Sequence, residues 1–313
     1  MPTSLKGRSL VRLQDWTPEE IRLVLEQAER LKARQRQRAE HSLLEGRTIA
    51  LLFEKPSTRT RISFVVAMQQ LGGHALDLSM ELMHVGKGGE PIRDTALVMS
   101  RYVDAIVVRA YRQSLVDELA RWAEVPVING LSDAFHPCQA LADVLTIRER
   151  FDGLEGVRVA YLGDGDNNVT HSLMTVCAKL GVDVVVASPP GYEPRPEVVG
   201  ACQEAAARAG STVRVVHDPR EAATGADVLY TDVWTSMGKE DEQEARRAAF
   251  SLFGVDEALL ALASERAVVM HCLPARCGEE ITEGVLYGPR SAVWDQAENR
   301  LHAQKGLLAL VVR

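Results

Sequence analysis

The segment KPSTRTR, residues 55–61, concentrates groups that bind anions. A short apolar run at 47–53 precedes it, and apolar residues at helical spacing follow it as far as Gly72 and Gly73. These patterns place the segment at a turn between a strand and a helix, with Ser57 at the N-cap position. A helix N-terminus favours acidic residues, yet this first turn holds two arginines and no acid. Its N–H groups, hydroxyls and guanidinium groups predict a phosphate site; a solvated basic turn capped by Ser57 is the alternative.

Other polar residues follow strand-like runs, and ligands of open α/β sheets gather at the carboxyl ends of strands. Arg109 follows the run AIVV, although a plain surface arginine is an equal alternative. His136 and Gln139 stand at the start of a helix that Pro137 opens. A neutral imidazole there can donate to a carbonyl oxygen, and a local helix cap is the alternative.

The turn GDGDNN, residues 163–168, is similar to a dinucleotide-binding fingerprint. Asn168, however, occupies the position of the third glycine, and Asp164 and Asp166 repel a pyrophosphate. The turn therefore disfavours a nucleotide. Asn168 is better suited to orienting a polar small molecule.

Two further turns carry groups that suit an amino-acid substrate. Asp232 opens the segment DVWTSMG, whose carboxylate, hydroxyl and N–H groups can hold both charges of an amino acid. A glycine turn capped by Asp232 is the alternative. Cys272 lies in HCLP, residues 271–274, where its thiol is either inert core or a contact for a reacting amine.

Composition limits the classes of function. The chain has 313 residues, of which 46% are hydrophobic and 25% charged, values typical of a soluble globular protein of two domains. A net charge of −7 argues against nucleic acid and anionic membranes as partners. The five cysteines show no C-x-x-C pair, so we expect neither a structural metal site nor a disulfide framework. Without a membrane-length apolar run or a signal core, we expect a protein of the reducing cytoplasm.

Strand-like and helical segments alternate along the chain, which predicts an α/β protein with two doubly wound domains, each a central parallel sheet flanked by helices. The expected strands are 47–53, 75–78, 104–108, 126–128, 157–163, 182–188, 212–216, 227–232 and 267–272.

The expected domain boundary is the turn-rich stretch 152–156, which separates domains 1–150 and 151–290. Expected helices begin at Pro18, after the N-cap Thr17, and at Pro137. A last helix within 291–313 is expected to pack back on the first domain.

Four motifs in order resemble the aspartate/ornithine carbamoyltransferase family, and the resemblance spans essentially the whole chain. They are STRTR (57–61), HPCQ (136–139), DxxxSMG (232–238) and HCLP (271–274). DxxxSMG together with the cysteine of HPCQ is similar to the ornithine branch, whereas the aspartate enzymes typically show HPTQ and HPLP.

The resemblance implies an enzyme that transfers the carbamoyl group of carbamoyl phosphate to the δ-amine of L-ornithine, giving L-citrulline and phosphate. This is a step of arginine biosynthesis or of a urea-cycle type. The resemblance further implies no metal, no cofactor and no covalent enzyme intermediate. It also implies a homo-oligomer, either a trimer or a multiple of trimers.

The resemblance also assigns site residues. Those implied for carbamoyl phosphate are Ser57, Thr58, Arg59, Thr60, Arg109, His136, Gln139, Cys272, Leu273 and Arg300. Those implied for ornithine are Asn168, Asp232, Ser236 and Met237. Arg59, Arg109, His136 and Cys272 are the implied catalytic residues. Arg59 would stabilise the leaving phosphate, and Arg109, Thr60 and His136 would polarise the carbamoyl oxygen.

Three positions depart from the family pattern. Val65 stands where a glutamate is usual, His84 where a glutamine is usual in a loop that is one residue longer, and Cys277 where an arginine is common. Three alternatives therefore stay open. They are a carbamoyltransferase for putrescine, aspartate or an acylated ornithine, a non-catalytic amino-acid or dinucleotide module, and a paralogue that has lost activity.

Overall fold

The computed structural model describes residues 4–55, 57–80, 83, 89–235 and 240–312. The chain forms two compact units, each of which is described by itself below. Unit 1 comprises Met1–Ala142 and Asn299–Arg313, and unit 2 comprises Asp143–Glu298. Both unit limits fall inside helices, where no turn residue marks them, and the boundary expected at 152–156 stays a prediction.

Unit 1 contains a four-stranded parallel sheet in the order β2-β1-β3-β4. The strands are β1 (Thr48–Phe53), β2 (His74–Ser79), β3 (Ala105–Arg109) and β4 (Val127–Leu131). Strands β3 and β4 are buried along their whole length, as the continuous apolar runs of a helix-covered parallel sheet require. The edge strand β2 is largely exposed.

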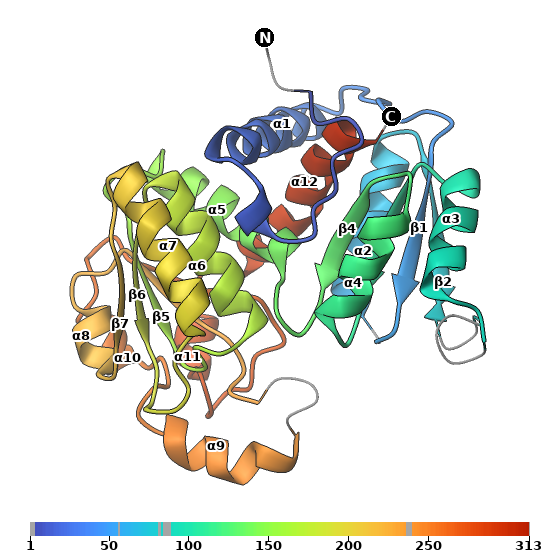
Figure 1. The fold of residues 1–313 in the computed structure, drawn as a ribbon. Helices are drawn as coiled ribbons and strands as arrows, with labels where there is room; N and C mark the ends of the chain where they lie inside the picture. Colours follow the sequence, from blue (N-terminus) through green and yellow to red (C-terminus); the bar gives the residue numbers. More distant parts are fainter. Residues whose placement is uncertain (1–3, 56, 81–82, 84–88, 236–239, 313) are drawn as a thin grey trace. The chain divides into compact units, whose positions relative to one another are not determined.

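Helices flank this sheet and build the rest of unit 1 (Figure 1). They are α1 (Pro18–Arg36), α2 (Thr58–Gln70), α3 (Ile92–Tyr102), α4 (Gln113–Trp122) and the part of α12 (Val293–Val311) from Asn299 onward. Helix α1 begins as predicted, because Thr17 and Glu20 form a complete capping box. Helix α12 packs so closely on α1 that a side chain at Gly306 would approach the backbone nitrogen of Ala28 to 2.7 Å.

Unit 2 contains a five-stranded parallel sheet in the order β7-β6-β5-β8-β9. The strands are β5 (Arg158–Leu162), β6 (Asp183–Ala187), β7 (Val213–Val216), β8 (Val228–Thr231) and β9 (Val268–His271). The helices are α5 (Pro137–Phe151), α6 (Asn168–Leu180), α7 (Pro196–Ala209), α8 (Pro219–Ala223), α9 (Gln243–Phe250), α10 (Glu257–Leu260) and α11 (Glu283–Leu286).

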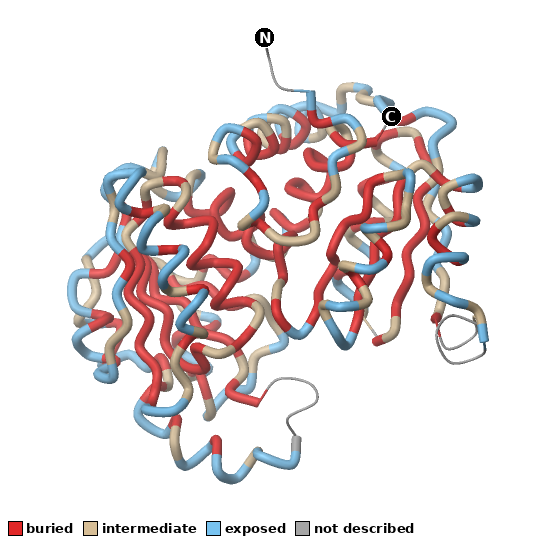
Figure 2. The backbone as a smooth tube through the Cα atoms, in the orientation of Figure 1, coloured by how far each residue is buried: buried red, intermediate tan, exposed pale blue. Residues whose placement is uncertain are grey.

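The predicted fold class is confirmed, and each expected strand corresponds to a strand of the structure. In both sheets the central strands form the buried core (Figure 2). Ile62 does not lie on the buried apolar face of α2, because 56% of its surface is exposed. Phe64 and Met68 are buried as expected. Among the described residues, none of the helices has the length and apolar character needed to cross a membrane.

Candidate active site

The predicted phosphate site of unit 1 lies at the carboxyl edge of its sheet. Two guanidinium groups converge there on the hydroxyl of Thr60, which is buried in the first turn of α2. Arg300 donates to Thr60 Oγ1 at 2.8 Å, and Arg109 donates to the same atom at 3.4 Å. Both arginines are at least nine-tenths buried. Two buried cations that share one neutral acceptor repel each other, so an anion bound beside them would be strongly favoured.

His136 lies in the same basic surroundings. Its imidazole is 3% exposed and directly precedes α5. Burial lowers the pKa of His136 well below its usual value, and the nearby charges of Arg300, Arg109 and Arg59 lower it further. The imidazole is therefore neutral at physiological pH. A neutral ring carries one N–H, which suits donation to a carbonyl oxygen.

This neutrality predicts a pH dependence of stability. The unfolded chain binds a proton at His136 below pH 6.5 and the folded chain does not, so stability is lost as pH falls. We expect this residue to lower the free energy of unfolding as pH falls below 6.5, by at most about 1.4 kcal/mol for each pH unit. Urea unfolding at pH 7 and pH 5 measures the loss, which should shrink in His136→Asn. His74→Asn, which removes an exposed imidazole, is the control and should retain the full loss.

The remaining predicted groups of the anion site occupy the start of α2. Ser57 is the N-cap residue, as expected, but its side chain makes no capping hydrogen bond in the described chain. Thr58 and Arg59 follow it and are exposed, and the first turn contains no acidic residue. The expected cap by the Ser57 side chain is therefore absent, whereas the exposure of Thr58 and Arg59 agrees with a solvated basic turn.

One arginine of the segment does not join the others. Arg61 forms an ion pair with Asp77 of β2, with 2.9 Å between Nε and Oδ2, and stacks over the ring of Phe53. The expectation that both arginines of the first turn converge on one anion is corrected accordingly. Positions 59 and 61 are about 200° apart around a helix, so their side chains leave opposite faces.

The helix that follows His136 brings Gln139 into the interior, where it is 1% exposed. The neighbouring Cys138 donates to the carbonyl of Asn129 at 3.4 Å, and burial raises the pKa of its thiol to about 12. This cysteine is a packing residue without nucleophilic character.

In unit 2, Asn168 is the first residue of α6, whose N-cap is Asn167. The Asn167 side chain accepts from the backbone N–H groups of Val169 and Thr170 at 2.7 and 2.9 Å. Its amide donates to the hydroxyl of Tyr161 at 3.0 Å. Capping thus falls to Asn167, and Asn168 itself sits at the carboxyl edge of the sheet, where ligands gather.

The GDGDNN turn is closely packed at Gly165. A side chain at Gly165 would meet Ser188 Oγ and Pro194 Cδ at 2.6 Å, so this glycine serves the close approach of another chain segment. Asp164 is fully buried and forms an ion pair with Arg246 at 2.8 Å, while Asp166 pairs with Arg195 at 2.9 Å. The acids of the turn therefore have structural partners.

Asp232 and Cys272 follow the neighbouring strands β8 and β9 and meet at their carboxyl ends. The thiol of Cys272 donates to Asp232 Oδ1 at 3.2 Å. Burial raises the pKa of Asp232, which is 6% exposed. Leu273 follows with a left-handed backbone, φ +61°. The two other predicted ornithine residues, Ser236 and Met237, lie outside the described residues.

Asp232, His271 and Cys272 bring potential metal-ligand atoms within 4.8 Å of one another. The ring of His271 is already engaged on both sides, however. Its Nδ1 accepts from the Leu273 N–H at 2.9 Å, and its Nε2 lies 3.2 Å from Glu280 Oε1. A metal ion would have to break one of these bonds, so the geometry fits a substrate contact better than a metal site.

Sequence patterns missed Arg246. Its guanidinium group, which is 4% exposed, bonds Asp164 and also donates to the carbonyl of Trp234 at 2.9 Å. It therefore links the turn before Asn168 to the segment after Asp232. In the sequence it looked like a surface residue of a charged helix, because Glu242 pairs with it four residues away.

Two of the three positions that depart from the family pattern lie among the described residues. Val65 is half-buried on α2, and Cys277 is exposed. His84 lies outside the described residues.

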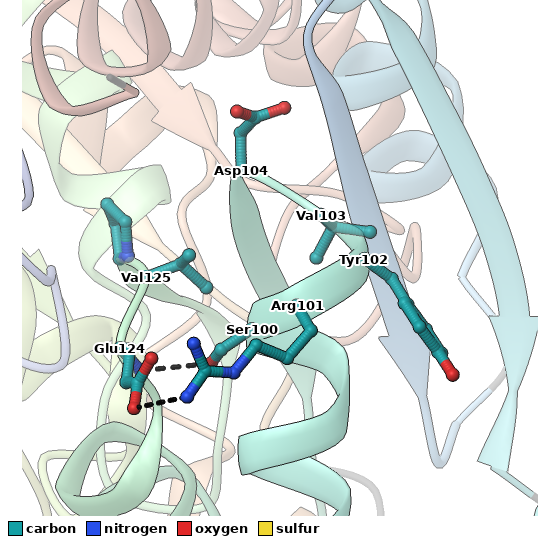
Figure 3. Close-up of a pocket in the computed structure, with 8 residues that line it drawn as sticks. Ser100, Arg101, Tyr102, Val103, Asp104, Glu124 and Val125 are labelled. Carbon is teal, nitrogen blue, oxygen red and sulfur yellow. Dashed lines mark hydrogen bonds and ion pairs between the residues drawn. The ribbon is translucent and has the colours of Figure 1, made fainter.

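A separate pocket of about 320 Å³ lies at the opposite, amino edge of the unit 1 sheet (Figure 3). It is lined by Ser100, Arg101, Tyr102, Val103, Asp104, Glu124, Val125 and Pro126. Its main polar groups bond within the protein, since Arg101 bonds Glu124 at 3.2 Å and Asp104 bonds Arg47 at 2.7 Å. Because ligands of parallel sheets bind at the carboxyl edge, we do not assign a substrate to this pocket.

Comparison with protein families places these two units in a known class. Residues 8–149 match the carbamoyl-P binding domain of aspartate/ornithine carbamoyltransferases, and residues 155–311 match the Asp/Orn binding domain. The chain therefore belongs to the aspartate/ornithine carbamoyltransferase family, as its motifs predict.

Individual relatives are of the ornithine type. The chain is 55% identical over 312 residues to the ornithine carbamoyltransferase of Pyrococcus abyssi, covering 100% of this chain and 98% of the relative. The Pyrococcus furiosus relative, named as an anabolic ornithine carbamoyltransferase, is also 55% identical, with the same coverage. The solved P. furiosus structure superposes with a TM-score of 0.96 and 55% identity, over 99% of this chain and 98% of that one.

Proposed function

We infer that this protein is an ornithine carbamoyltransferase, which transfers the carbamoyl group of carbamoyl phosphate to the δ-amine of L-ornithine. The products are L-citrulline and phosphate. The single observation that carries the proposal is the buried group of Arg109, Arg300 and His136 around Thr60, in a domain of the carbamoyl-P binding type. Full-length similarity to ornithine enzymes supports the acceptor.

The proposed donor site holds the phosphate at the start of α2, through Ser57, Thr58, Arg59 and Thr60. Arg109, Thr60 and His136 polarise the carbamoyl oxygen, and Arg300 and Gln139 lie on the same side of the proposed site. Cationic and neutral N–H donors fixed in a buried site stabilise the charge that develops on this oxygen during attack. His136 contributes as a neutral donor because its pKa is lowered by burial and by the arginines.

The proposed acceptor site binds the ends of ornithine with Asn168 and Asp232, and with Ser236 and Met237. The carboxylate of Asp232 suits an ammonium group, and the amide of Asn168 suits a carboxylate. Cys272 and Leu273 line the reacting centre, where they contact the carbamoyl group of the donor and border the reacting amine. Cys272 donates to Asp232 and so orients its carboxylate.

The two substrates alone account for every bond and proton of the proposed reaction. The neutral δ-amine forms a bond to the carbamoyl carbon, and the bond from that carbon to the phosphate oxygen breaks. The bonding electron pair leaves with the phosphate, which is basic enough to take the proton that the amine loses. The role of the protein is to hold the two substrates in line and to stabilise charge.

Other acceptors are less well supported. An acetylornithine transcarbamylase of known structure is 32% identical to this chain, whereas several solved ornithine carbamoyltransferases are between 36% and 55% identical to it. A citrulline assay with carbamoyl phosphate and ornithine, run beside putrescine, aspartate and acetylornithine, tests the assignment. Citrulline formation at the highest kcat/KM is the expected result, and use of another acceptor in preference to ornithine contradicts it.

We further propose that the protein works as a homo-oligomer, a trimer or a multiple of one. Unit 1 exposes apolar side chains on the edge strand β2 and on α2, which packs against it, namely Leu76 at 47% and Ile62 at 56%. An open strand edge with apolar neighbours is a common site of association.

Light scattering tests this assembly. The expected mass is three times the 34.4 kDa of one chain, or a multiple of that value. Leu76→Lys should lower the mass, because it places a charge in the proposed contact. Leu252→Lys alters a leucine of unit 2 that is 79% exposed and should leave the mass unchanged. A monomeric wild-type chain contradicts the proposal.

The cysteines support a reducing compartment, and we propose the cytoplasm. All five are free thiols, and Cys138, Cys177 and Cys202 are buried.

A further inference from the structure

A buried pair of titratable side chains stands behind the turn that carries Cys272 and Leu273. His271 ends β9, and Glu280 lies nine residues further along the chain. His271 Nε2 and Glu280 Oε1 are 3.2 Å apart, and both side chains are fully buried. Neither residue belongs to the substrate contacts proposed above.

The hydrogen bonds fix which ring nitrogen of His271 carries the proton. The backbone N–H of Leu273 donates to Nδ1 at 2.9 Å, so Nδ1 is the unprotonated nitrogen. The proton of the neutral ring is therefore on Nε2, from which it is donated to Glu280. Glu280 thus selects the tautomer that can hold the Leu273 N–H.

The backbone that this bond holds is in an uncommon conformation. Leu273 has φ +61°, in the left-handed region that residues with a Cβ rarely adopt. Such a conformation persists only where surrounding bonds enforce it. The bond from Leu273 N–H to His271 is one such constraint, and it lies directly beside the thiol that meets Asp232.

Further bonds hold the pair in place. The backbone N–H of His271 donates to Gln296 Oε1 at 2.8 Å, and the Gln296 amide donates to Asp143 at 2.7 Å. On the other side, Glu280 Oε1 also accepts from the backbone N–H of Arg276 at 2.5 Å. Hydrogen bonds to neighbouring groups therefore hold both His271 and Glu280 in place.

We propose that Glu280 is a positioning residue for carbamoyl transfer, which acts through the His271 ring to fix the Cys272–Leu273 backbone against the reacting amine. The inference rests on the proposed function. A purely structural pair would stabilise the fold and affect both substrates alike. A positioning pair affects the turnover and the amine acceptor most, because the pair holds the Leu273 backbone next to the thiol that donates to Asp232.

Three variants separate these roles. Glu280→Gln keeps an oxygen that accepts from His271 and Arg276, and it should keep kcat within about threefold of wild type. Glu280→Ala removes the acceptor and frees the ring, and we expect kcat to fall about 100-fold, the usual effect of a small misplacement of reacting groups. The KM for ornithine should rise more than the KM for carbamoyl phosphate, because the phosphate is bound by α2 in unit 1. Glu280→Asp withdraws the carboxylate by one methylene and should lose about tenfold in kcat.

Glu279→Gln is the matched control. Glu279 is the adjacent acid in the same segment, and it pairs with Arg247 and Arg276 instead of His271. Its loss should leave kcat and both KM values near wild type. If the Ala variant does not fold, the Asp variant carries the test.

Wild-type turnover in folded Glu280→Ala or Glu280→Asp would overturn the proposal, and so would an equal rise of both KM values. A wild-type protein that makes no citrulline would instead refute the proposed function, so the two failures are distinguishable.

Discussion

Replacing Arg59 with glycine is expected to lower kcat by about 10²- to 10³-fold, the loss seen when one donor to a developing anion is removed. Arg59 stands in an acid-free first helical turn and is close enough to His136 to lower the pKa of that histidine, after burial and the two nearer arginines. In the proposed donor site its charge stabilises the departing phosphate. Initial rates of citrulline formation measure the loss.

Arg61 is the matched control, because it lies in the same turn and carries the same charge. It pairs with Asp77 and stacks on Phe53. We expect Arg61→Gln to keep wild-type kcat. Near-normal turnover in Arg59→Gly, or equal losses in the two variants, would refute the role given to Arg59.

The second large effect is expected from Asp232→Asn, which should raise the KM for ornithine about 10- to 100-fold, since a hydrogen bond to a charged group is worth about 1.5–3 kcal/mol. Burial raises the pKa of Asp232, so the folded protein holds this proton more tightly than the unfolded chain does. Above the raised pKa the ionised group costs stability, and Asp232→Asn should therefore unfold at the same temperature as wild type or higher.

The pH profile gives a second measure. Wild-type affinity for ornithine should fall as pH drops through the raised pKa of Asp232, and the asparagine variant should lack this acid limb.

Asp227 is the control at the opposite end of β8. Burial acts to raise the pKa of its carboxyl, but hydrogen bonds from Arg266 and from the Arg158 backbone outweigh burial and lower it. Asp227→Asn should therefore lose stability above the unfolded pKa and keep the KM for ornithine. An unchanged ornithine KM in Asp232→Asn would contradict the site.

Local patterns predicted the fold well, because each of its elements depends on near neighbours in the chain. The strands appear as short apolar runs, since a helix-covered parallel sheet buries both faces of its strands. Thr17, Pro18 and Glu20 predict the start of α1. The capping bonds join Thr17 and Glu20, which are only three residues apart. The helix expected to begin at Pro137 likewise begins there.

The site was harder to predict, because its contacts join distant residues. The bond between Arg300 and Thr60 spans 240 positions, and only the family resemblance suggested it. The sequence around Arg59 and Arg61 shows two positive charges. It does not show which of the two arginines pairs with β2. In the sequence, Glu280 cannot be told from a surface glutamate, because no local pattern shows that His271 contacts it in the fold.

Unit 1 is discontinuous in the chain, and this determines when Arg59, Arg109 and Arg300 can come together. Arg300, one of the two guanidinium groups on Thr60, belongs to the segment that returns after all of unit 2. Arg59 and Arg109 are therefore synthesised long before Arg300. A nascent chain that exposes only the first 142 residues lacks Arg300, and so does any truncation that removes α12. Arg109 and Arg300 can therefore meet at Thr60 only after residues 143–298 have been synthesised.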